Sequence, residues 1–193
     1  MVETVAERRP GRHGVDEAAL RLFAENGVAG TSLQMIADAM GVTKAAIYYH
    51  YRSKDEIVLG VLAPLVDELP RILEQARSRR GRVARADALV TGLVDLVIAQ
   101  AARYHVVMGD PGVREVLGQQ EWLLDWWRET RHLLAGPTPD TDARVAISML
   151  LIALQAPIND PELRSLPEEA LRHAMLAAAR RLLQLPRRAT ATA

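Results

Sequence analysis

The sharpest hydrophobic pattern in the chain lies between residues 31 and 54. Apolar residues there recur three or four positions apart, which predicts one buried helical face: Leu33, Ile36, Ala37 and Met40. Gly41 follows at once, and glycine can end a helix in the left-handed conformation because it has no Cβ to clash. Ile47 then lies where a second helix would pack back against the small Ala37. This spacing is typical of a helix-turn-helix.

The polar residues of this segment are placed where helices need caps. Thr31 and Ser32 precede the first helix, and Thr43 precedes the second. Their side-chain oxygens can accept hydrogen bonds from the free amides of a first turn. The chain has only two lysines, Lys44 and Lys54, and both lie in this segment. Either the compact ammonium is needed here at a phosphate, or the coincidence is chance.

The aromatic residues of the second helix divide between two faces. Tyr48 shares a face with Lys44, which indicates a surface for DNA, whereas Tyr51 shares the face of Ile47 and is predicted to pack inside. The alternative is that these tyrosines, with Tyr49, only close a small helical core.

Helical periodicity continues on both sides of this segment, and no strand pattern appears. The fold class is therefore predicted to be all-α. A long helix from residue 54 should bend at Pro64 or Pro70, because proline removes a backbone donor. The predicted helices cover residues 14–26, 54–79, 84–108, 113–117, 119–134 and 142–155, and a last one runs from 167 to 185.

The stretch from Asp142 to Gln155 is apolar on nearly every side, so it is predicted to be a buried helix that needs a partner to cover it. The last helix carries a second apolar stripe, and together they predict a four-helix homodimer interface. The alternative is that both helices are interior to one chain. The interface candidates are Met149, Ile152, Leu171, Met175, Ala178 and Leu182.

A cluster of large aromatic residues is the candidate pocket for a small, largely apolar effector, since rigid aromatics with a few polar groups commonly line pockets. The same residues are also ordinary core residues, and that alternative stays open. The pocket candidates are Tyr104, His105, Met108, Trp122, Trp126 and Trp127.

Composition adds mainly exclusions. The chain has no cysteine, and its five histidines include no pair three or four residues apart, so no metal site and no cofactor are expected. No phosphate loop, nucleophile elbow or HExxH motif occurs, which argues against an enzyme. No signal peptide is visible, and the stretch 145–158 is expected to be too short to span a bilayer, so we expect a cytoplasmic protein.

The formal net charge is +0, but charge need not be global to steer DNA. Seven lysines or arginines lie between residues 8 and 54, against four acidic residues. The basic arm of residues 1–11 is expected to be flexible, and it either enters a minor groove or is a solvated leader. The arginines between 77 and 85 are interpreted as a solvated turn.

The segment from about Arg12 to Leu62 resembles the DNA-binding domain of the TetR family of transcriptional regulators. The resemblance rests on a residue set in the first helix and a second set after it: Arg12, Val15, Ala18, Ala19, Leu22, Phe23 and Gly27, then Thr31, Ser32, Ile36, Ala37, Gly41, Val42, Tyr48, His50, Lys54 and Leu59. It implies a three-helix DNA-binding domain at 12–58, an effector-binding and dimerisation domain at 59–185 and a disordered tail at 186–193.

The resemblance also implies which residues meet DNA. The candidates are Thr31, Ser32, Thr43, Lys44, Ala45, Tyr48, Tyr49, His50 and Lys54. Ala45 and Ala46 offer only methyl groups, so direct base readout is expected to be thin. The function implied is that of a homodimeric, ligand-responsive regulator, most often a repressor, on an inverted-repeat operator. The alternatives are a non-catalytic helical interaction protein and a DNA-binding regulator without an effector.

Overall fold

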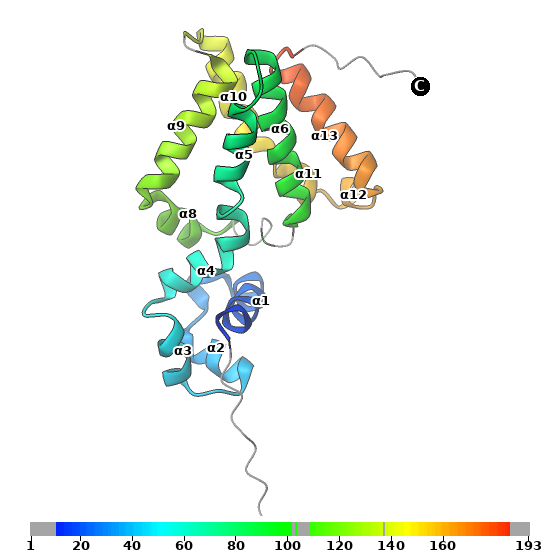
Figure 1. The fold of residues 1–193 in the computed structure, drawn as a ribbon. Coiled ribbons are helices and arrows are strands. Elements are labelled where there is room, and N and C mark those ends of the chain that lie inside the picture. The colour runs from blue at the N-terminus through cyan, green and yellow to red at the C-terminus, as the bar shows by residue number, and fades with distance from the viewer. Residues whose placement is uncertain (1–10, 102, 104–108, 137, 186–193) are drawn as a thin grey trace, which may run out of the picture. The chain divides into compact units, whose positions relative to one another are not determined.

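A computed structural model describes residues 11–101, 103, 109–136 and 138–185, and every regular element in these ranges is a helix (Figure 1). The chain divides into two compact units. We call residues 1–64 with 105–120 the head, and residues 65–104 with 121–193 the body. The predicted all-α class is confirmed.

Among its described residues, the head has four labelled helices from its first segment and one from its second. They are α1 (Arg12–Gly30), α2 (Leu33–Met40), α3 (Lys44–His50), α4 (Lys54–Val66), whose last residues enter the body, and α8 (Pro111–Gly118). Gly27 interrupts α1 with a φ of 71°, so the helical backbone ends where the sequence predicted. The division predicted at residue 58 did not foresee that α8, from the middle of the chain, packs on α1.

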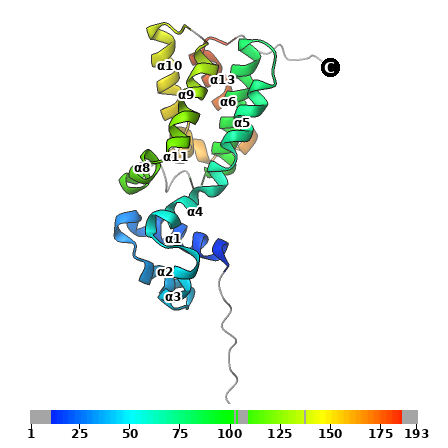
Figure 2. The same cartoon turned by 60° about the vertical axis from the view of Figure 1, so that its left-hand side comes forward.

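The body is built around α6, which α5, α9 and α13 contact. Its helices are α5 (Leu69–Arg77), α6 (Arg82–Ala99), α9 (Glu121–Ala135), α10 (Thr141–Ala153), α11 (Ala156–Asn159), α12 (Pro161–Arg164) and α13 (Glu168–Leu182). Figures 1 and 2 show α5, α6, α9, α10 and α13 running side by side along the body. Seven apolar side chains of α6 are buried, which makes it the core helix of this unit.

The long helix predicted over 54–79 is two helices. Pro64 lies inside α4 and does not end it. A turn at Asp67 and Glu68 separates the two helices, and Pro70 occupies the first turn of α5. Proline is tolerated in a first turn because the amide there has no helical partner anyway. The helix predicted over 84–108 begins at Arg82 and its described part ends at Ala99, while α11 and α12 were not predicted.

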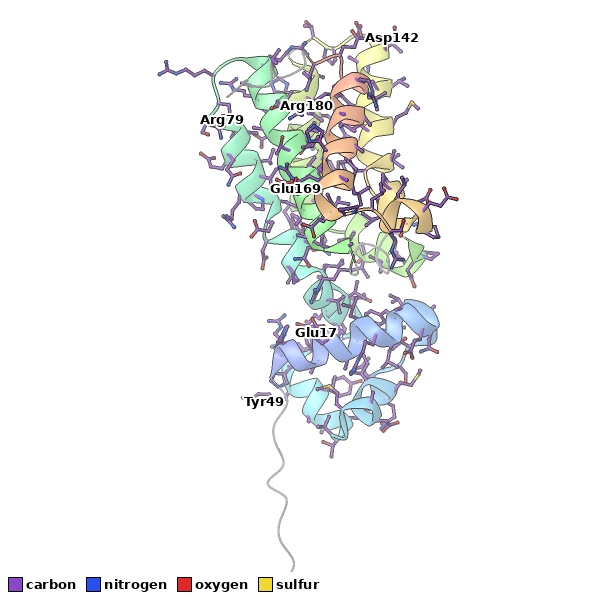
Figure 3. The ribbon with its side chains drawn as sticks, turned by 90° about the vertical axis from the view of Figure 1, so that its right-hand side faces the viewer. Glu17, Tyr49, Arg79, Asp142, Glu169 and Arg180 are labelled. Atoms are coloured by element: carbon purple, nitrogen blue, oxygen red, sulfur yellow. The ribbon has the colours of Figure 1, made fainter. Side chains whose placement is uncertain are left out.

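Ion pairs hold the outer helix of the body on α6. Arg172 donates to Asp95 at 2.6 Å, and Arg180 donates to Asp87 at 2.6 Å, so both join α13 to α6. Figure 3 labels Arg180 on α13 within the body. The side chains of Arg180 and Asp87 are mostly buried. Salt therefore screens this ion pair less than it screens a pair on the surface.

The sequence predicted a helix over 142–155 that needs a partner to cover it, and it predicted that the stretch 145–158 is too short to span a bilayer. In the structure the helical run Thr141–Asn159 is mostly exposed, with 17% of it buried, which leaves a face for a partner, whereas by length and composition alone it could cross a membrane. A turn at Leu154 and Gln155 divides it into α10 and α11. The described helices therefore leave the outer side of α10 uncovered.

Candidate nucleic-acid interface

The start of α2 uses its two candidate caps differently. Ser32 is the N-cap, and its Oγ accepts from the Met35 amide at 3.2 Å. Thr31 is buried, and its hydroxyl lies within hydrogen-bond distance of the carbonyls of Gly27 (2.8 Å) and Leu22 (3.1 Å). The expectation that Thr31 caps α2 and faces DNA is therefore wrong for its side chain, which closes the end of α1. Ser32 remains exposed.

The turn between α2 and α3 has the geometry that the sequence predicted. Gly41 is left-handed, with φ 65° and ψ 33°. Its amide donates to the carbonyl of Asp38 at 3.1 Å, and the amide of Val42 donates to the carbonyl of Ala37 at 3.0 Å. These two bonds form a Schellman motif, which stops α2 and reverses the chain within two residues. The turn thereby fixes where α3 begins.

The helix α3 begins at a cap and keeps one face exposed. Thr43 accepts from the amide of Ala46 at 3.3 Å. Ile47 is fully buried, whereas Tyr48 is 49% exposed and Tyr49 is 77% exposed. The ammonium of Lys44 lies 5.8 Å from the centre of the Tyr48 ring, as the shared face predicted.

Four further observations complete this surface. Thr43 and Ala45 are exposed at the start of α3, and His50 at its end is half-buried. The ring of His50 meets that of Tyr49 edge to face, with centroids 5.1 Å apart. Figure 3 shows Tyr49 extending outward from the ribbon. The head thus presents a short helix whose outer side carries cationic, aromatic and methyl groups that its own core does not bury.

Tyr51, just beyond α3, is fully buried, as predicted. Its hydroxyl donates to Asp16 and accepts from Arg12 Nε at 3.0 Å, and the Arg12 guanidinium lies 4.7 Å from the ring centre. Burial and the Asp16 carboxylate raise the pKa of Tyr51 to about 12, and burial raises the pKa of Asp16. This cluster joins the start of α1 to the end of α3.

Gly60 of α4 lies against the same cluster. A Cβ at this position would meet the Tyr51 hydroxyl and would lie 2.6 Å from Asp16 Oδ1. Sequence reasoning missed the cluster because its members are 35 and 39 residues apart. The only signal was the tyrosine on the buried face, which needed a polar partner for its hydroxyl.

Lys54 was predicted to contact phosphate, and its ammonium has other partners. It donates to the carbonyl of Val28 at 2.7 Å and to that of Thr31 at 3.2 Å, so it holds the end of α1 to the start of α4. An ammonium has three donors, which leaves one beyond these two bonds. The amide of Val28 in turn donates to Asp110 Oδ2 at 2.6 Å. Asp110 is not among the candidate site residues predicted from the sequence.

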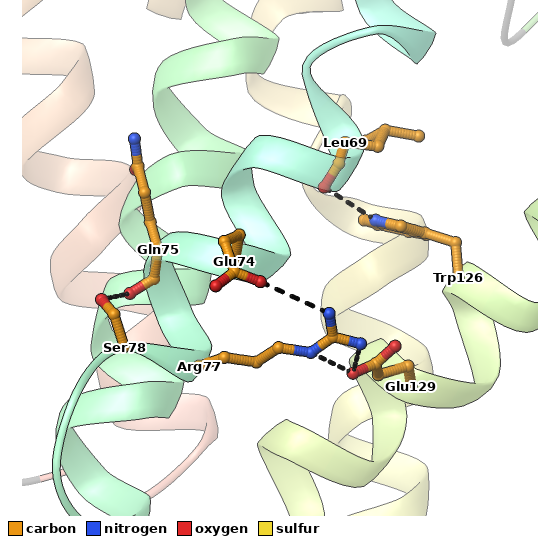
Figure 4. A network of polar contacts seen from close by, with 7 residues as sticks. All are labelled: Leu69, Glu74, Gln75, Arg77, Ser78, Trp126 and Glu129. Atoms are coloured by element: carbon orange, nitrogen blue, oxygen red, sulfur yellow. Dashed lines mark hydrogen bonds and ion pairs between the residues drawn. The ribbon is translucent and has the colours of Figure 1, made fainter.

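The candidate pocket residues do not form one described site. Tyr104, His105 and Met108 lie outside the described residues. Trp122 is 40% exposed, and Trp127 is half-buried. Trp126 is buried, and its Nε1 donates to the carbonyl of Leu69 at 3.1 Å (Figure 4).

Trp126 thus serves the core of the body, where it joins α9 to the start of α5. Arg77 Nε donates to Glu129 at 2.6 Å in the same seam, where Arg77 also meets Glu74, as Figure 4 shows. The assignment of Trp126 to a pocket is corrected on this ground, because its ring and its polar group are both engaged within the chain.

The six interface candidates divide by burial. Met149 and Ile152 on α10 are 58% and 71% exposed, and on α13 Ala178 is exposed and Leu182 is 37% exposed. Leu171 and Met175 are instead buried inside their own chain, so their prediction as interface residues is wrong. The helix that carries them, α13, packs on α6 and on α10. An open groove follows α10, lined by Thr141, Arg144, Val145, Ser148, Met149, Ile152 and Ala153.

Within the described ranges, no group of three or more histidines, cysteines, aspartates or glutamates could hold a metal ion. What the head offers is therefore a surface. A capped helix-turn-helix with an exposed second helix is the form of a protein that reads the major groove of DNA.

Comparisons with known proteins place this head in a family. Residues 17–61 match the family model of bacterial regulatory proteins of the tetR family. The regulator AcrR of Shigella flexneri is 44% identical over 55 residues, which are 28% of this chain and 26% of AcrR. The activator FasR of Mycolicibacterium smegmatis is 31% identical over 99 residues, which are 51% of this chain and 45% of FasR. Residues 17–61 therefore carry the DNA-binding segment that the tetR family model of bacterial regulatory proteins describes.

Solved structures extend the likeness to the whole fold. SCO3833 of Streptomyces coelicolor A3, a member of the same family, has a TM-score of 0.64 at 24% identity and covers 90% of this chain and 91% of its own. FadR of Bacillus subtilis, solved with stearoyl-CoA, has a TM-score of 0.62 at 15% identity and covers 92% and 100%. The matched segments span less than half of the length of AcrR and of FasR.

Proposed function

We propose that this protein is a transcriptional regulator that binds duplex DNA with α3 in the major groove. The exposed face of α3 carries this proposal: Lys44, Tyr48 and Tyr49 point outward while Ile47 and Tyr51 hold the helix in place from behind. At the start of α3, Thr43 and Ala45 face the base edges. A methyl group contacts thymine but discriminates weakly, so DNA shape supplies part of the specificity.

The phosphate contacts come from the rim of this surface. They are the Ser32 hydroxyl at the start of α2, the hydroxyls of Tyr48 and Tyr49, the His50 ring and the remaining donor of Lys54. Such contacts orient a protein on the duplex without reading its sequence. Selecting bound sequences from random duplex DNA tests the proposal as a whole, and no enrichment over the starting pool would contradict it.

Removing the charge of Lys54 should weaken binding to specific and unrelated duplexes alike. We expect both Lys54→Ala and Lys54→Gln to flatten the slope of log affinity against log salt by about one unit, because one phosphate contact is lost. Tyr48→Phe should weaken binding to both duplexes without changing the slope, since it removes no charge. Fluorescence anisotropy over a salt series measures this.

Arg128→Gln is the matched control for Lys54. It removes a cation whose side chain is 76% exposed on α9, in the body, and should leave the slope unchanged. Lys54→Gln keeps two donors for the carbonyls of Val28 and Thr31, whereas Lys54→Ala does not, so only Ala should also lower the melting temperature. An unchanged slope in both Lys54 variants would remove Lys54 from the phosphate contacts.

We also propose that the protein is a homodimer that covers the apolar outer side of α10. Val145, Met149 and Ile152 are all more than half exposed, and Ala178 and Leu182 are exposed on α13, a helix that contacts α10. Exposed apolar residues in such a row are typical of a protein interface. A two-fold dimer would place two α3 helices about one turn of DNA, roughly 34 Å, apart or a little more, on an inverted repeat.

The regulator is proposed to be a cytoplasmic repressor that a small, largely apolar molecule releases from DNA. The support is the likeness of the fold to FadR, which was solved with stearoyl-CoA. FasR is an activator, so the direction of regulation needs its own test. The expression of a reporter gene placed behind the selected operator, compared with and without the protein, measures the direction of regulation.

Long-chain acyl-CoA is the probe for the effector. If it binds and weakens operator binding, DNA must weaken its binding by the same factor, because coupling between two sites is reciprocal. We expect about 5- to 150-fold in each direction, measured by calorimetry with and without operator. Equal DNA affinity at saturating acyl-CoA would contradict this choice of effector. A regulator without an effector would bind its operator and respond to no ligand, and a helical interaction protein would fail the DNA selection itself.

A further inference from the structure

Asp110 joins two parts of the head that the chain separates widely. It is the N-cap of α8, where its Oδ1 accepts from the Gly112 amide at 2.7 Å. Its Oδ2 accepts from the amide of Val28 at 2.6 Å, across 82 residues. One carboxylate therefore starts α8 and holds the last residues of α1, after the break at Gly27, at the same time. Charge-assisted bonds of this kind are stronger than neutral ones.

The bond to Val28 lies where the helical backbone of α1 is interrupted. Gly27 has φ 71° and ψ 167°, so the helical backbone is broken immediately before Val28. The Val28 side chain is 4% exposed, and it contacts the position where a Cβ on Gly112 would lie, at 3.3 Å. A Cβ on Gly27 would lie 3.1 Å from Asp110 Oδ2. Glycine at 27 thus permits both the turn and the approach of the carboxylate.

Val28 also connects Asp110 to the start of α4. The Val28 amide donates to Asp110, and the Val28 carbonyl accepts from Lys54 at 2.7 Å. Lys54 is the first residue of α4, four residues after the end of α3. A carboxylate, a peptide group and an ammonium therefore form a continuous polar relay from α8 to the connection that follows α3.

We propose that Asp110 is a positioning residue for α3, and that it makes the presentation of α3 depend on α8. The relay fixes the backbone at Val28, Val28 fixes Lys54, and Lys54 fixes where the chain leaves α3. Body residues both precede and follow residues 105–120, so the segment that carries α8 is joined to the body at each of its ends in the sequence. This inference rests on the proposed DNA-binding function.

Asp110→Asn separates the relay from the cap. Asparagine is as good an N-cap as aspartate, so α8 keeps its start. The amide nitrogen, however, is a donor, and it cannot accept from Val28 while the amide oxygen accepts from Gly112. Asp160→Asn is the matched control, because Asp160 also caps a helix with proline at its first position and only accepts from amides of its own helix, Glu162 and Leu163.

We expect Asp110→Asn to lower operator affinity by about 10-fold, or about 1.4 kcal/mol, at an unchanged salt slope. The amide resonances of Tyr48 and Tyr49 should shift in its NMR spectrum, which a loss of stability elsewhere would not produce. Asp160→Asn should change neither quantity. In a Lys54→Gln background, the effect of Asp110→Asn should shrink well below 10-fold, since residues of one relay are not additive.

Additive effects of the two substitutions, or wild-type affinity for Asp110→Asn, would overturn the relay. If Asp110→Asn does not fold, Asp110→Ser replaces it, because serine caps α8 but cannot reach Val28. Wild-type protein runs in the same assay. Absence of DNA binding by the wild type would defeat the proposed function, whereas wild-type binding that Asp110→Asn leaves intact would defeat only this inference.

Discussion

Gly60→Ala is expected to unfold the head and abolish DNA binding. The added methyl group would displace the Tyr51 hydroxyl and crowd Asp16 Oδ1 at 2.6 Å, so the buried cluster with Arg12 could not form. Overpacking costs about 1–3 kcal/mol, and a buried polar group left without its partner costs about as much again. A loss of roughly 3 kcal/mol or more is a large share of the stability of a unit of this size.

Tyrosine ionisation gives a direct measurement of this cluster. The pKa of Tyr51 is raised to about 12, above its ordinary value of about 10. The stability that this group contributes is therefore fully present below about pH 10 and is lost as the pH rises through about 12. In Gly60→Ala the late-titrating tyrosine should disappear from the ultraviolet titration.

Gly118→Ala is the control for the glycine substitution. Gly118 lies at the end of α8 in the same unit, and a Cβ there meets nothing within 4 Å. The melting temperature and the DNA affinity of the Gly118→Ala protein should match those of the wild type. A Gly60→Ala protein that melts normally and retains the late tyrosine would show that α4 can move away from Tyr51 at little cost.

Ile152→Glu is expected to dissociate the homodimer and leave each chain folded. Ile152 is 71% exposed in the single chain, so a carboxylate there is solvated in the monomer but would be buried and unpaired in the dimer. We expect the dimer dissociation constant to rise at least about 100-fold, which equals roughly 3 kcal/mol. Sedimentation at micromolar concentration measures the change, and operator binding should fall with it.

Two further Glu substitutions make the result specific. Val83→Glu changes an apolar residue of α6 that is 41% exposed and should leave the dimer intact. Met175→Glu places the charge at a residue that is 6% exposed within its own chain, so it should unfold the protein instead. A wild-type protein that sediments as a monomer, or an Ile152→Glu protein that stays dimeric, would reject α10 as the interface.

The helix-turn-helix could be predicted from the sequence because its determinants are local. The caps at Ser32 and Thr43, the left-handed Gly41 and the buried Ile47 all lie within 16 residues. Each of these acts on the backbone of its own helix or on the helix next to it. The exposed face of α3 followed from the same periodicity.

The body was harder to predict because apolar periodicity does not say which neighbour covers a face. The stripe on α13 was correctly identified as apolar, but Leu171 and Met175 are buried within their own chain while Leu182 stays 37% exposed. Trp126 is a second example. The sequence showed a large aromatic residue on a helix, but it did not show that its Nε1 donates to the distant carbonyl of Leu69 inside the body.

By itself, the sequence determined the helical class, the turn at Gly41 and the outward face of α3, since these depend on residues within a few positions of one another. Only the tertiary structure decided which polar groups pair across the chain. Asp110 lies 82 residues from Val28, and Tyr51 lies 35 residues from Asp16. A buried hydroxyl or amide must find a partner, but its chemistry does not specify which distant residue supplies it, and the packing of the helices makes that choice.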